Sequence, residues 1–206
     1  MEFLHSVMAL EAIMLLEKNI SFSIGGAVGY MNDEVYGKDF NRDSAKEWWN
    51  VTLDKMSNSE REFVDGVEFP IVLVEMPGSM AMAFQTNVGP VIVLPTQGFD
   101  RLGENGKIVE LVIAVAHEEC HCRQYKDGRL VMDFHSGMGT WMEETKLVYD
   151  VKDYLNRPWE REAYSHSWKV AKEVLNESRK GFIRDDKTMF GKIARFMGVD
   201  LPNDLK

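Results

Sequence analysis

Cysteine and positive charge are both scarce in this sequence. The 206-residue chain holds two cysteines, and its 24 Lys and Arg residues are outnumbered by 33 Asp and Glu residues, which gives a formal net charge of −9. Two cysteines cannot build a disulfide framework, and sparse reduced thiols are typical of the cytoplasm, where we therefore expect the protein. An acidic chain without a basic cluster lacks the charge that follows nucleic-acid phosphates, so we expect no nucleic-acid partner.

Long hydrophobic runs, internal repeats and low-complexity segments are also missing. The apolar-rich segment 3–16 is too short for a membrane span, contains Glu11 and lacks a positively charged start, so we expect neither a signal sequence nor a membrane partner. Its helical spacing predicts a packing helix with His5 as a surface histidine. Residues 20–30 hold three glycines but no following Lys-Ser or Lys-Thr, which predicts a turn or close strand packing instead of a phosphate loop. We expect one domain over residues 1–206.

What the sequence does contain is the motif HExxH. Residues 117–121 read HEECH and follow the apolar run 111–116. Two histidines four positions apart lie one turn apart on the same face of a helix, so both imidazoles can bind one zinc ion. The glutamate after the first histidine points beside the pair, where it can act on a water molecule at the ion. We predict His117 and His121 as zinc ligands and Glu118 as the general base.

The residues around the motif predict a helix. The segment 107–126 contains neither Gly nor Pro, residues 105–106 (Asn-Gly) form a start signal, and Gly128 forms a stop. The part before the motif is apolar nearly all round, which is typical of a buried helix. Cys120 and Cys122 point away from each other on such a helix, so we expect buried, reduced thiols and no disulfide between them. A soft metal ligand is the alternative for Cys120.

A third ligand must come from further along the chain. The positions three and six residues after His121 hold Gln124 and Asp127, where metzincins have Gly and His, so that class is excluded. The remaining common ligand set adds a glutamate from a later helix to the two histidines. The sequence must therefore offer a glutamate on a second predicted helix.

The segment RPWEREAY at residues 157–164 offers two candidates, Glu160 and Glu162. Pro158 suits the first turn of a helix, because its missing N–H costs nothing there, and we expect this helix to continue to about residue 180. Two positions apart on a helix, the two glutamates point about 200° apart, so only one of them can face the metal.

Together these motifs resemble the gluzincin metallopeptidases, in which E-x-x-A follows HExxH. The forms HEECHCRQ and RPWEREAY are similar to small metallopeptidases inferred in bacteriophage genomes and, more distantly, to peptidase domains of mobile elements that cleave repressor proteins. The resemblance covers about residues 90–170. It implies that Glu160 is the third ligand of one Zn²⁺ per chain. Glu162 is the second choice for this ligand, with a solvated or arginine-paired glutamate as the alternative. The resemblance also implies a bacterial cytoplasm or a phage-infected host cell.

Two roles remain open at this point. Many of these relatives carry an acid at the position of Tyr164, so the partner that orients a ligand histidine is not assigned. The donor that would stabilise the oxyanion is not assigned either. His135 is one candidate for that donor, with an ordinary loop histidine as the alternative. The other candidates are Tyr149, Tyr154, Tyr164 and His166.

Ahead of the motif the pattern changes to that of strands. Residues 69–75, 80–85 and 90–95 predict three strands, with a turn at residues 87–90 between the last two. We expect Val91–Leu94 at the edge of this sheet, where it could pair with an extended substrate, with a fully paired internal strand as the alternative.

The remaining segments predict short elements. A capping box at Ser44–Glu47 predicts a helix to about Met56, and residues 60–64 a short helix. Residues 127–145 predict a turn and a short hairpin or loop, and residues 187–196 a final helix. The predicted fold class is α+β and zincin-like: a small three-stranded sheet packed on a central HExxH helix, with additional N- and C-terminal helices.

These predictions favour a zinc-dependent endopeptidase acting on a protein or peptide substrate. Zinc lowers the pKa of a bound water towards about 7, and Glu118 can then accept its proton and deliver it to the leaving amine. One alternative is a non-catalytic binding or regulatory protein that keeps the fold. Another is a phage structural component. The intact Glu118 speaks against a non-catalytic protein, because a catalytic base has no structural reason to persist.

Overall fold

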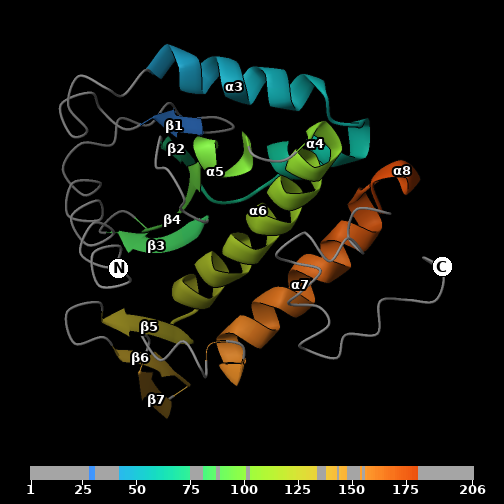
Figure 1. Cartoon of the computed structure of the whole chain (residues 1–206). Helices are drawn as coiled ribbons and strands as arrows, with labels where there is room; N and C mark the ends of the chain where they lie inside the picture. Colours follow the sequence, from blue (N-terminus) through green and yellow to red (C-terminus); the bar gives the residue numbers. More distant parts are fainter. Residues whose placement is uncertain are drawn as a thin grey trace.

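The computed structural model describes residues 28–30, 42–74, 81–86, 89–100, 103–133, 138–142, 144–147, 154 and 156–180. The helices expected over residues 3–16 and 187–196 lie outside these ranges. The described part is a mixed α+β structure (Figure 1). Its helices are α3 (Arg42–Asp54), α4 (Asn58–Asp65), α5 (Thr96–Asp100), α6 (Glu104–Lys126), α7 (Pro158–Val174) and α8 (Glu177–Lys180). Its strands are β1 (Val28–Tyr30), β2 (Ile71–Val74), β3 (Met82–Thr86), β4 (Gly89–Pro95), β5 (Leu130–Asp133), β6 (Met138–Trp141) and β7 (Glu144–Leu147).

The first sheet has four strands in the order β1-β2-β4-β3. The three predicted strands are present as β2, β3 and β4, and β1 adds a fourth that pairs in parallel with β2. Strand β4 runs parallel to β2 and antiparallel to β3, with Ile92 opposite both Ile71 and Ala83. The expectation that Val91–Leu94 forms the edge was therefore wrong, since β4 is paired on both sides. Among the described strands β3 forms that edge.

The turn between β3 and β4 was predicted at residues 87–90, of which Asn87 and Val88 lie outside the described residues. The strand pairing places Thr86 opposite Gly89, and the Thr86 hydroxyl donates a hydrogen bond of 2.7 Å to the Gly89 carbonyl. Gly89 has φ +125°, a conformation that residues with a side chain rarely adopt. Glycine suits this position because it has no side chain that this conformation would strain.

Helix α6 crosses the centre of the molecule and is buried on all sides from Ile108 to Cys122 (Figure 1). It begins at Glu104, earlier than the sequence predicts, and Asn105 and Gly106 lie inside its first turn. Gly103 precedes it, and the Glu104 carboxylate lies near the positive end of the helix dipole. The predicted stop is confirmed, because Asp127 caps the helix and Gly128 has φ +68°. No helix in the described part of the chain combines the length and the hydrophobicity that a membrane-spanning segment requires.

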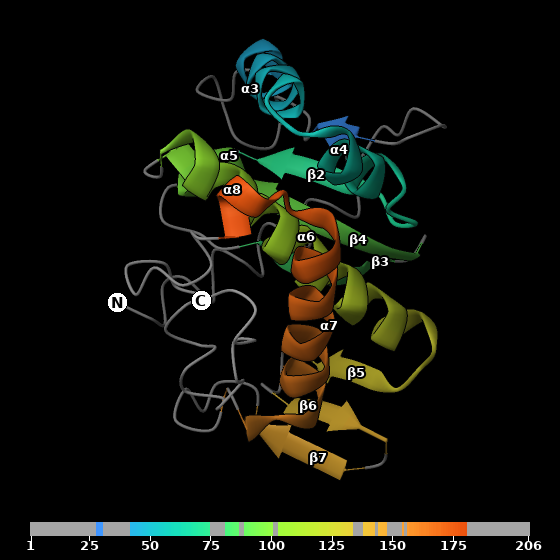
Figure 2. The same ribbon diagram turned by 90° about the vertical axis from the view of Figure 1, so that its right-hand side faces the viewer.

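Helix α7 lies along α6 in both ribbon views (Figures 1 and 2). It begins at Pro158 as predicted, with Arg157 as the preceding residue in extended conformation. It ends at Val174, earlier than predicted, because Leu175 is extended, with φ −70° and ψ 137°. The short helix α8 then follows as a separate element. The α6–α7 pair is the part of the fold that carries the motif residues.

The segment after α6 forms a second sheet in place of the single hairpin or loop expected there. Its strands β5, β6 and β7 are antiparallel and follow one another in sequence order. The Trp141 ring on β6 lies 6.4 Å from that of Trp159 at the start of α7, and the Arg129 guanidinium lies over Trp141 at 5.1 Å. These contacts attach the second sheet to the end of α7 that carries Glu160.

The capping box expected at Ser44 was misplaced. Helix α3 begins at Arg42, so Ser44 lies within its first turn. A capping arrangement occurs instead at α4, where the Glu60 carboxylate accepts a hydrogen bond of 2.7 Å from the Ser57 N–H. The expected short helix over residues 60–64 is present within α4.

Candidate metal centre

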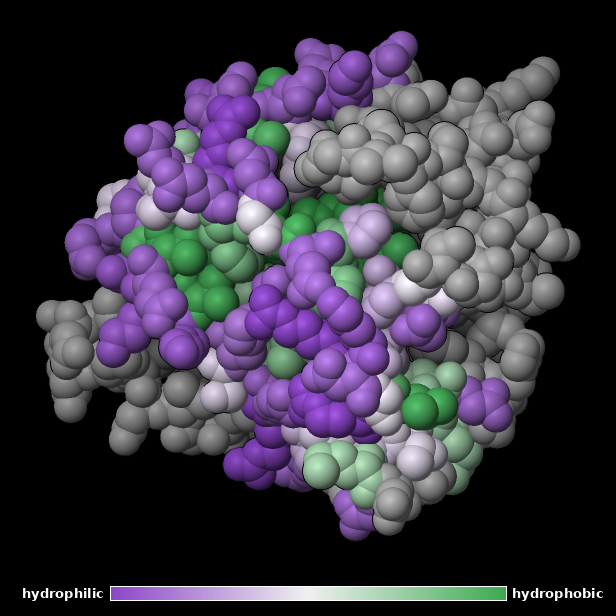
Figure 3. All heavy atoms as spheres, turned by 180° about the vertical axis from the view of Figure 1, so that it is seen from behind, coloured by the Kyte–Doolittle hydropathy of each residue, from purple (hydrophilic) through white to green (hydrophobic). Residues whose placement is uncertain are grey.

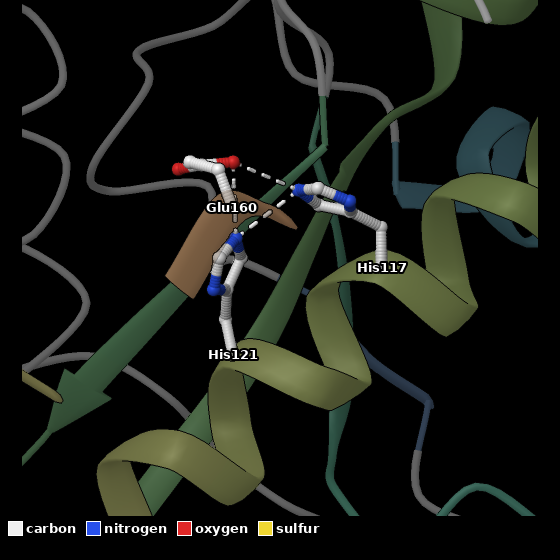
Figure 4. A group of neighbouring side chains, drawn as sticks. All are labelled: His117, His121 and Glu160. Atoms are coloured by element: carbon white, nitrogen blue, oxygen red, sulfur yellow. Dashed lines mark hydrogen bonds and ion pairs between the residues drawn. The ribbon is translucent and has the colours of Figure 1, made fainter. Parts of the chain in front are cut away.

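Three buried side chains converge between α6 and α7 (Figure 4). The Nε2 atoms of His117 and His121 lie 3.1 Å apart. One carboxylate oxygen of Glu160, Oε2, lies 3.3 Å from Nε2 of His117 and 3.5 Å from Nε2 of His121. The histidines come from successive turns of α6, and Glu160 comes from the first turn of α7. The structure therefore brings together the three ligands predicted from the sequence.

The triangle formed by these atoms has the dimensions of one face of a zinc coordination tetrahedron. Zinc binds histidine nitrogen and carboxylate oxygen at about 2.0–2.2 Å, which places neighbouring ligand atoms about 3.3–3.5 Å apart. The observed separations of 3.1, 3.3 and 3.5 Å are close to this range. Within the described part of the chain, Glu160 Oε2 is buried and has no hydrogen-bond partner. An oxygen that faces two ring nitrogens without a hydrogen bond fits a position beside a cation.

Charge and burial oppose each other at this cluster. The side chains of His117, His121 and Glu160 are each less than a tenth exposed. Burial alone would raise the pKa of Glu160, but the positive charge of His121 and the contacts with both histidines together outweigh burial and hold this pKa well below its usual value. Burial lowers the pKa of His117. For His121, the contacts with Glu160, Glu118 and Gln124 together outweigh burial and raise the pKa to about 9. The cluster thus favours one positive charge beside the Glu160 carboxylate, which a metal ion also supplies.

Glu118 lies beside the cluster and is not part of it. Burial raises the pKa of its carboxyl group to about 8, with the charge of Glu160 adding to this effect, and the charge of His121 opposing it. The carboxyl group also accepts a hydrogen bond from the backbone of Ala83 on β3. A buried carboxyl group with a pKa near neutrality, next to three side chains that could hold a metal ion, has the properties of a proton acceptor and donor.

Glu162, the other glutamate of the second motif, points away from the cluster. Its two carboxylate oxygens accept hydrogen bonds of 2.9 and 2.7 Å from one nitrogen of Arg129. This confirms the expectation of an arginine pair. With Arg123 and His166, these two residues line a cavity of about 500 Å³, to which none of the three cluster residues contributes. Hydrophilic residues cover much of the molecular face seen from behind (Figure 3).

The remaining candidates from the sequence are placed as follows. His135 and Tyr149 lie outside the described residues. The Tyr164 ring packs against the His117 ring at 4.3 Å. Tyr154 is partly buried, and burial, the charge of Glu160 and a side-chain hydrogen bond with Glu160 keep its pKa well above the usual value. His166 faces Glu119 instead, with 3.8 Å between its Nε2 and a carboxylate oxygen.

The two cysteines are buried and free, as expected. Burial raises the pKa of Cys120 to about 12 and raises that of Cys122 further, so both are thiols and not thiolates at neutral pH. Cys120 does not belong to the group that could hold a metal within the described residues. The alternative of a soft ligand at Cys120 therefore finds no support in the geometry.

Sequence reasoning did not single out Gln124. Its side chain is completely buried, and its Oε1 lies 2.8 Å from Nδ1 of His121. The only local signal is its position three residues after His121, which puts both side chains on the same face of α6. Glutamine at such a position is common on helices, so the signal does not distinguish a contact with a ligand from an ordinary helix residue.

The chain matches no protein-family model, and no curated protein or solved structure is significantly similar to it. The site must therefore be judged on its own geometry and chemistry.

Proposed function

We propose that this protein is a zinc-dependent endopeptidase with a zincin-like arrangement of its sheet and central helix. The observation that supports this most is the convergence of two Nε2 atoms and one carboxylate oxygen within 3.1–3.5 Å of one another in the interior. Imidazole nitrogen and carboxylate oxygen are common ligands of zinc. Two histidines and one glutamate leave the fourth position of a tetrahedral ion open, which is the pattern of catalytic and not of structural zinc sites.

When bound, zinc would supply an activated water molecule and polarise the scissile carbonyl group. Glu118 is the residue of this chain that would handle the proton. Its carboxyl group has a pKa of about 8 without metal because it is buried, and a nearby cation lowers such a pKa, so that the carboxylate can accept a proton. It would then deliver this proton to the leaving amine, which completes the exchange of one peptide bond for a carboxylate and an amine.

The edge strand β3 offers a place for the substrate backbone. Ala83 on this strand contacts Glu118 through its backbone, so the strand passes directly beside the base. An extended peptide can add to an exposed strand edge by main-chain hydrogen bonds, with little dependence on sequence. We therefore assign to β3 the role that the sequence had suggested for Val91–Leu94.

The substitution Glu118→Gln tests the proposal, because it preserves size and hydrogen bonding but removes the base. The variant should bind zinc normally and hydrolyse peptides about 10²-fold or more slowly, as expected for loss of a general base. Glu119→Gln is a matched control: Glu119 is the next residue on α6, but its carboxylate accepts a 2.7 Å hydrogen bond from Arg123 and does not belong to the metal cluster. This control should retain most of the activity.

Cleavage of a broad peptide library, followed by mass spectrometry, is a suitable assay because it presumes no specificity. Equal turnover by zinc-loaded wild type and Glu118→Gln would contradict the mechanism while leaving the metal site intact. Zinc binding without any cleavage by the wild type would favour a regulatory protein that keeps the site. A chain that binds no metal would favour a structural role.

A further inference from the structure

Gln124 connects the two helices that carry the metal-binding cluster. Its side chain on α6 is 0% exposed and makes three polar contacts. Oε1 lies 2.8 Å from Nδ1 of His121, and Nε2 donates a hydrogen bond of 3.1 Å to the backbone carbonyl of Trp159. A weaker contact of 3.6 Å runs from Nε2 to Sγ of Cys120. One buried amide thus touches a candidate ligand on α6 and the residue immediately before the candidate ligand on α7.

The carbonyl of Trp159 determines which way this amide faces. A backbone carbonyl oxygen can only accept a hydrogen bond, so the NH₂ group of Gln124 must point to it. The amide oxygen must then point to His121. Since this oxygen is an acceptor, Nδ1 of His121 must carry the proton that fills the 2.8 Å contact. In the neutral imidazole the lone pair is then on Nε2, which is the atom that faces Glu160 and His117.

His117 lacks such a determinant within the described part of the chain. Its Nδ1 is buried and has no hydrogen-bond partner among those residues, and its ring packs against Tyr164 without fixing a proton. The two histidines of the motif therefore differ. His121 has its ring orientation and its tautomer fixed through Nδ1, whereas Nδ1 of His117 has no such partner among the described residues.

We propose that Gln124 is a positioning residue that prepares the centre for metal: it fixes His121 as the Nδ1–H tautomer and ties that ring to the first turn of α7, which bears Glu160. This inference rests on the zinc site of the proposed function but not on peptidase activity. Partners that orient a ligand histidine are typically worth 10- to 100-fold in metal affinity. The effect should therefore be visible with the metal alone.

Two substitutions separate the roles of this amide. Gln124→Met keeps the volume but removes both the acceptor for His121 and the donor to Trp159. Gln124→Glu keeps the acceptor and removes the donor. Glu162→Gln is the matched control, because it weakens a different contact to α7, the one with Arg129, without touching a ligand histidine. Circular dichroism establishes that each variant is folded before zinc is added.

The experiment measures zinc affinity by competition with a chromophoric chelator, and the ring protons of His121 in the zinc-loaded protein by ¹⁵N-edited NMR. In the wild type we expect a proton on Nδ1 that exchanges slowly with solvent. Gln124→Met should lose about 10- to 100-fold in affinity, with faster exchange of that proton. Gln124→Glu should keep the protected proton and lose less affinity, and Glu162→Gln should match the wild type.

A wild-type spectrum with the proton on Nε2 would overturn the proposal, and it requires no variant to fold. The proposal would also be overturned if a folded Gln124→Met protein bound zinc with wild-type affinity, or if both Gln124 variants lost zinc affinity equally. Absence of peptide cleavage by a protein that shows the expected zinc affinities and ring proton would count against the peptidase and leave this inference standing. A wild type that binds no zinc would overturn both.

Discussion

Glu60 on α4 and Arg179 on α8 form an ion pair in the interior, although they are 119 positions apart in the sequence. Glu60 is 0% exposed and Arg179 is 5% exposed. Both side chains make further hydrogen bonds. The guanidinium also donates to the Lys55 carbonyl and to Asn105 at the start of α6, and the carboxylate accepts from the N–H groups of Ser57 and Asn176. The pair therefore fastens α4 and α8 to the start of α6.

Removing one member of this pair should destabilise the protein strongly. Arg179→Met leaves the buried Glu60 carboxylate without its counter-charge, and we expect the free energy of unfolding to fall by about 3–5 kcal/mol. Urea denaturation measures this change. The double variant Glu60→Met/Arg179→Met should be considerably less destabilised than the sum of the single variants. Additive effects of the two substitutions would show that the pair does not act as a unit.

Metal content should depend on the cluster and not on histidine in general. The purified protein should contain about one zinc per chain, and His117→Ala should lose most of it, because two of the three ligands hold zinc poorly. His166→Ala serves as the control, since its ring faces Glu119 outside the cluster. Elemental analysis by mass spectrometry gives the stoichiometry. Full, tightly bound zinc in His117→Ala would mean that the site is wrongly assigned.

Chelation should lower the melting temperature. A metal that joins α6 to α7 binds the folded chain more tightly than the unfolded chain, so its free energy of binding adds to stability. Calorimetry before and after treatment with a chelator measures the shift, and re-addition of zinc should reverse it. In Glu160→Gln the same treatment should have a much smaller effect. Identical curves for metal-free and zinc-loaded wild type would place the metal at the periphery or exclude it.

The metal-free protein should lose stability between about pH 4.5 and pH 8 because of Glu118. Burial raises the pKa of this carboxyl group from 4.5 to about 8, so the folded state holds its proton over a range in which the unfolded state releases it. A raised carboxyl pKa favours folding at low pH and opposes it as the pH rises, until the folded state also ionises. In chelator, Glu118→Gln should become progressively more stable than the wild type across this range, by up to a few kcal/mol, and the difference should level off above it. A constant difference across the range would contradict the raised pKa.

The sequence predicts the part of the site on α6 much better than the part that α7 contributes. His117, Glu118 and His121 lie within two turns of one helix, so their arrangement follows from helix geometry. Glu160 depends on how α7 packs against α6. Helical phase allows only one of Glu160 and Glu162 to face the metal, and only the resemblance to the gluzincins favours Glu160. Gln124 could not be identified, because one of its two strong hydrogen bonds goes to a backbone carbonyl, which has no signature in the sequence.

The same distinction applies to the fold. The sequence predicted the strands with β-branched runs and the buried helix around the motif, because the hydrophobic pattern of each element is a local property. The sequence did not predict the order of the strands. Strands β2 and β4 are parallel neighbours, while β3, which lies between them in the sequence, forms an edge of the sheet. That arrangement depends on the long-range pairing of Ile71 with Ile92, which the alternation of residues along each strand does not encode.

The location of the second sheet within the chain has a consequence for folding. Strands β5, β6 and β7 all lie between His121 and Glu160, so an ion held by both residues would close a loop that contains the entire sheet. On the chain-entropy relation used for disulfides, closing a loop of this size disfavours the unfolded chain by about 4 kcal/mol. Because His117 and His121 are already adjacent on an isolated helix, zinc could be captured there early, with Glu160 joining when α7 docks. The ion would then act as a reversible cross-link. The two cysteines do not supply a covalent one, because both are free thiols on the same helix.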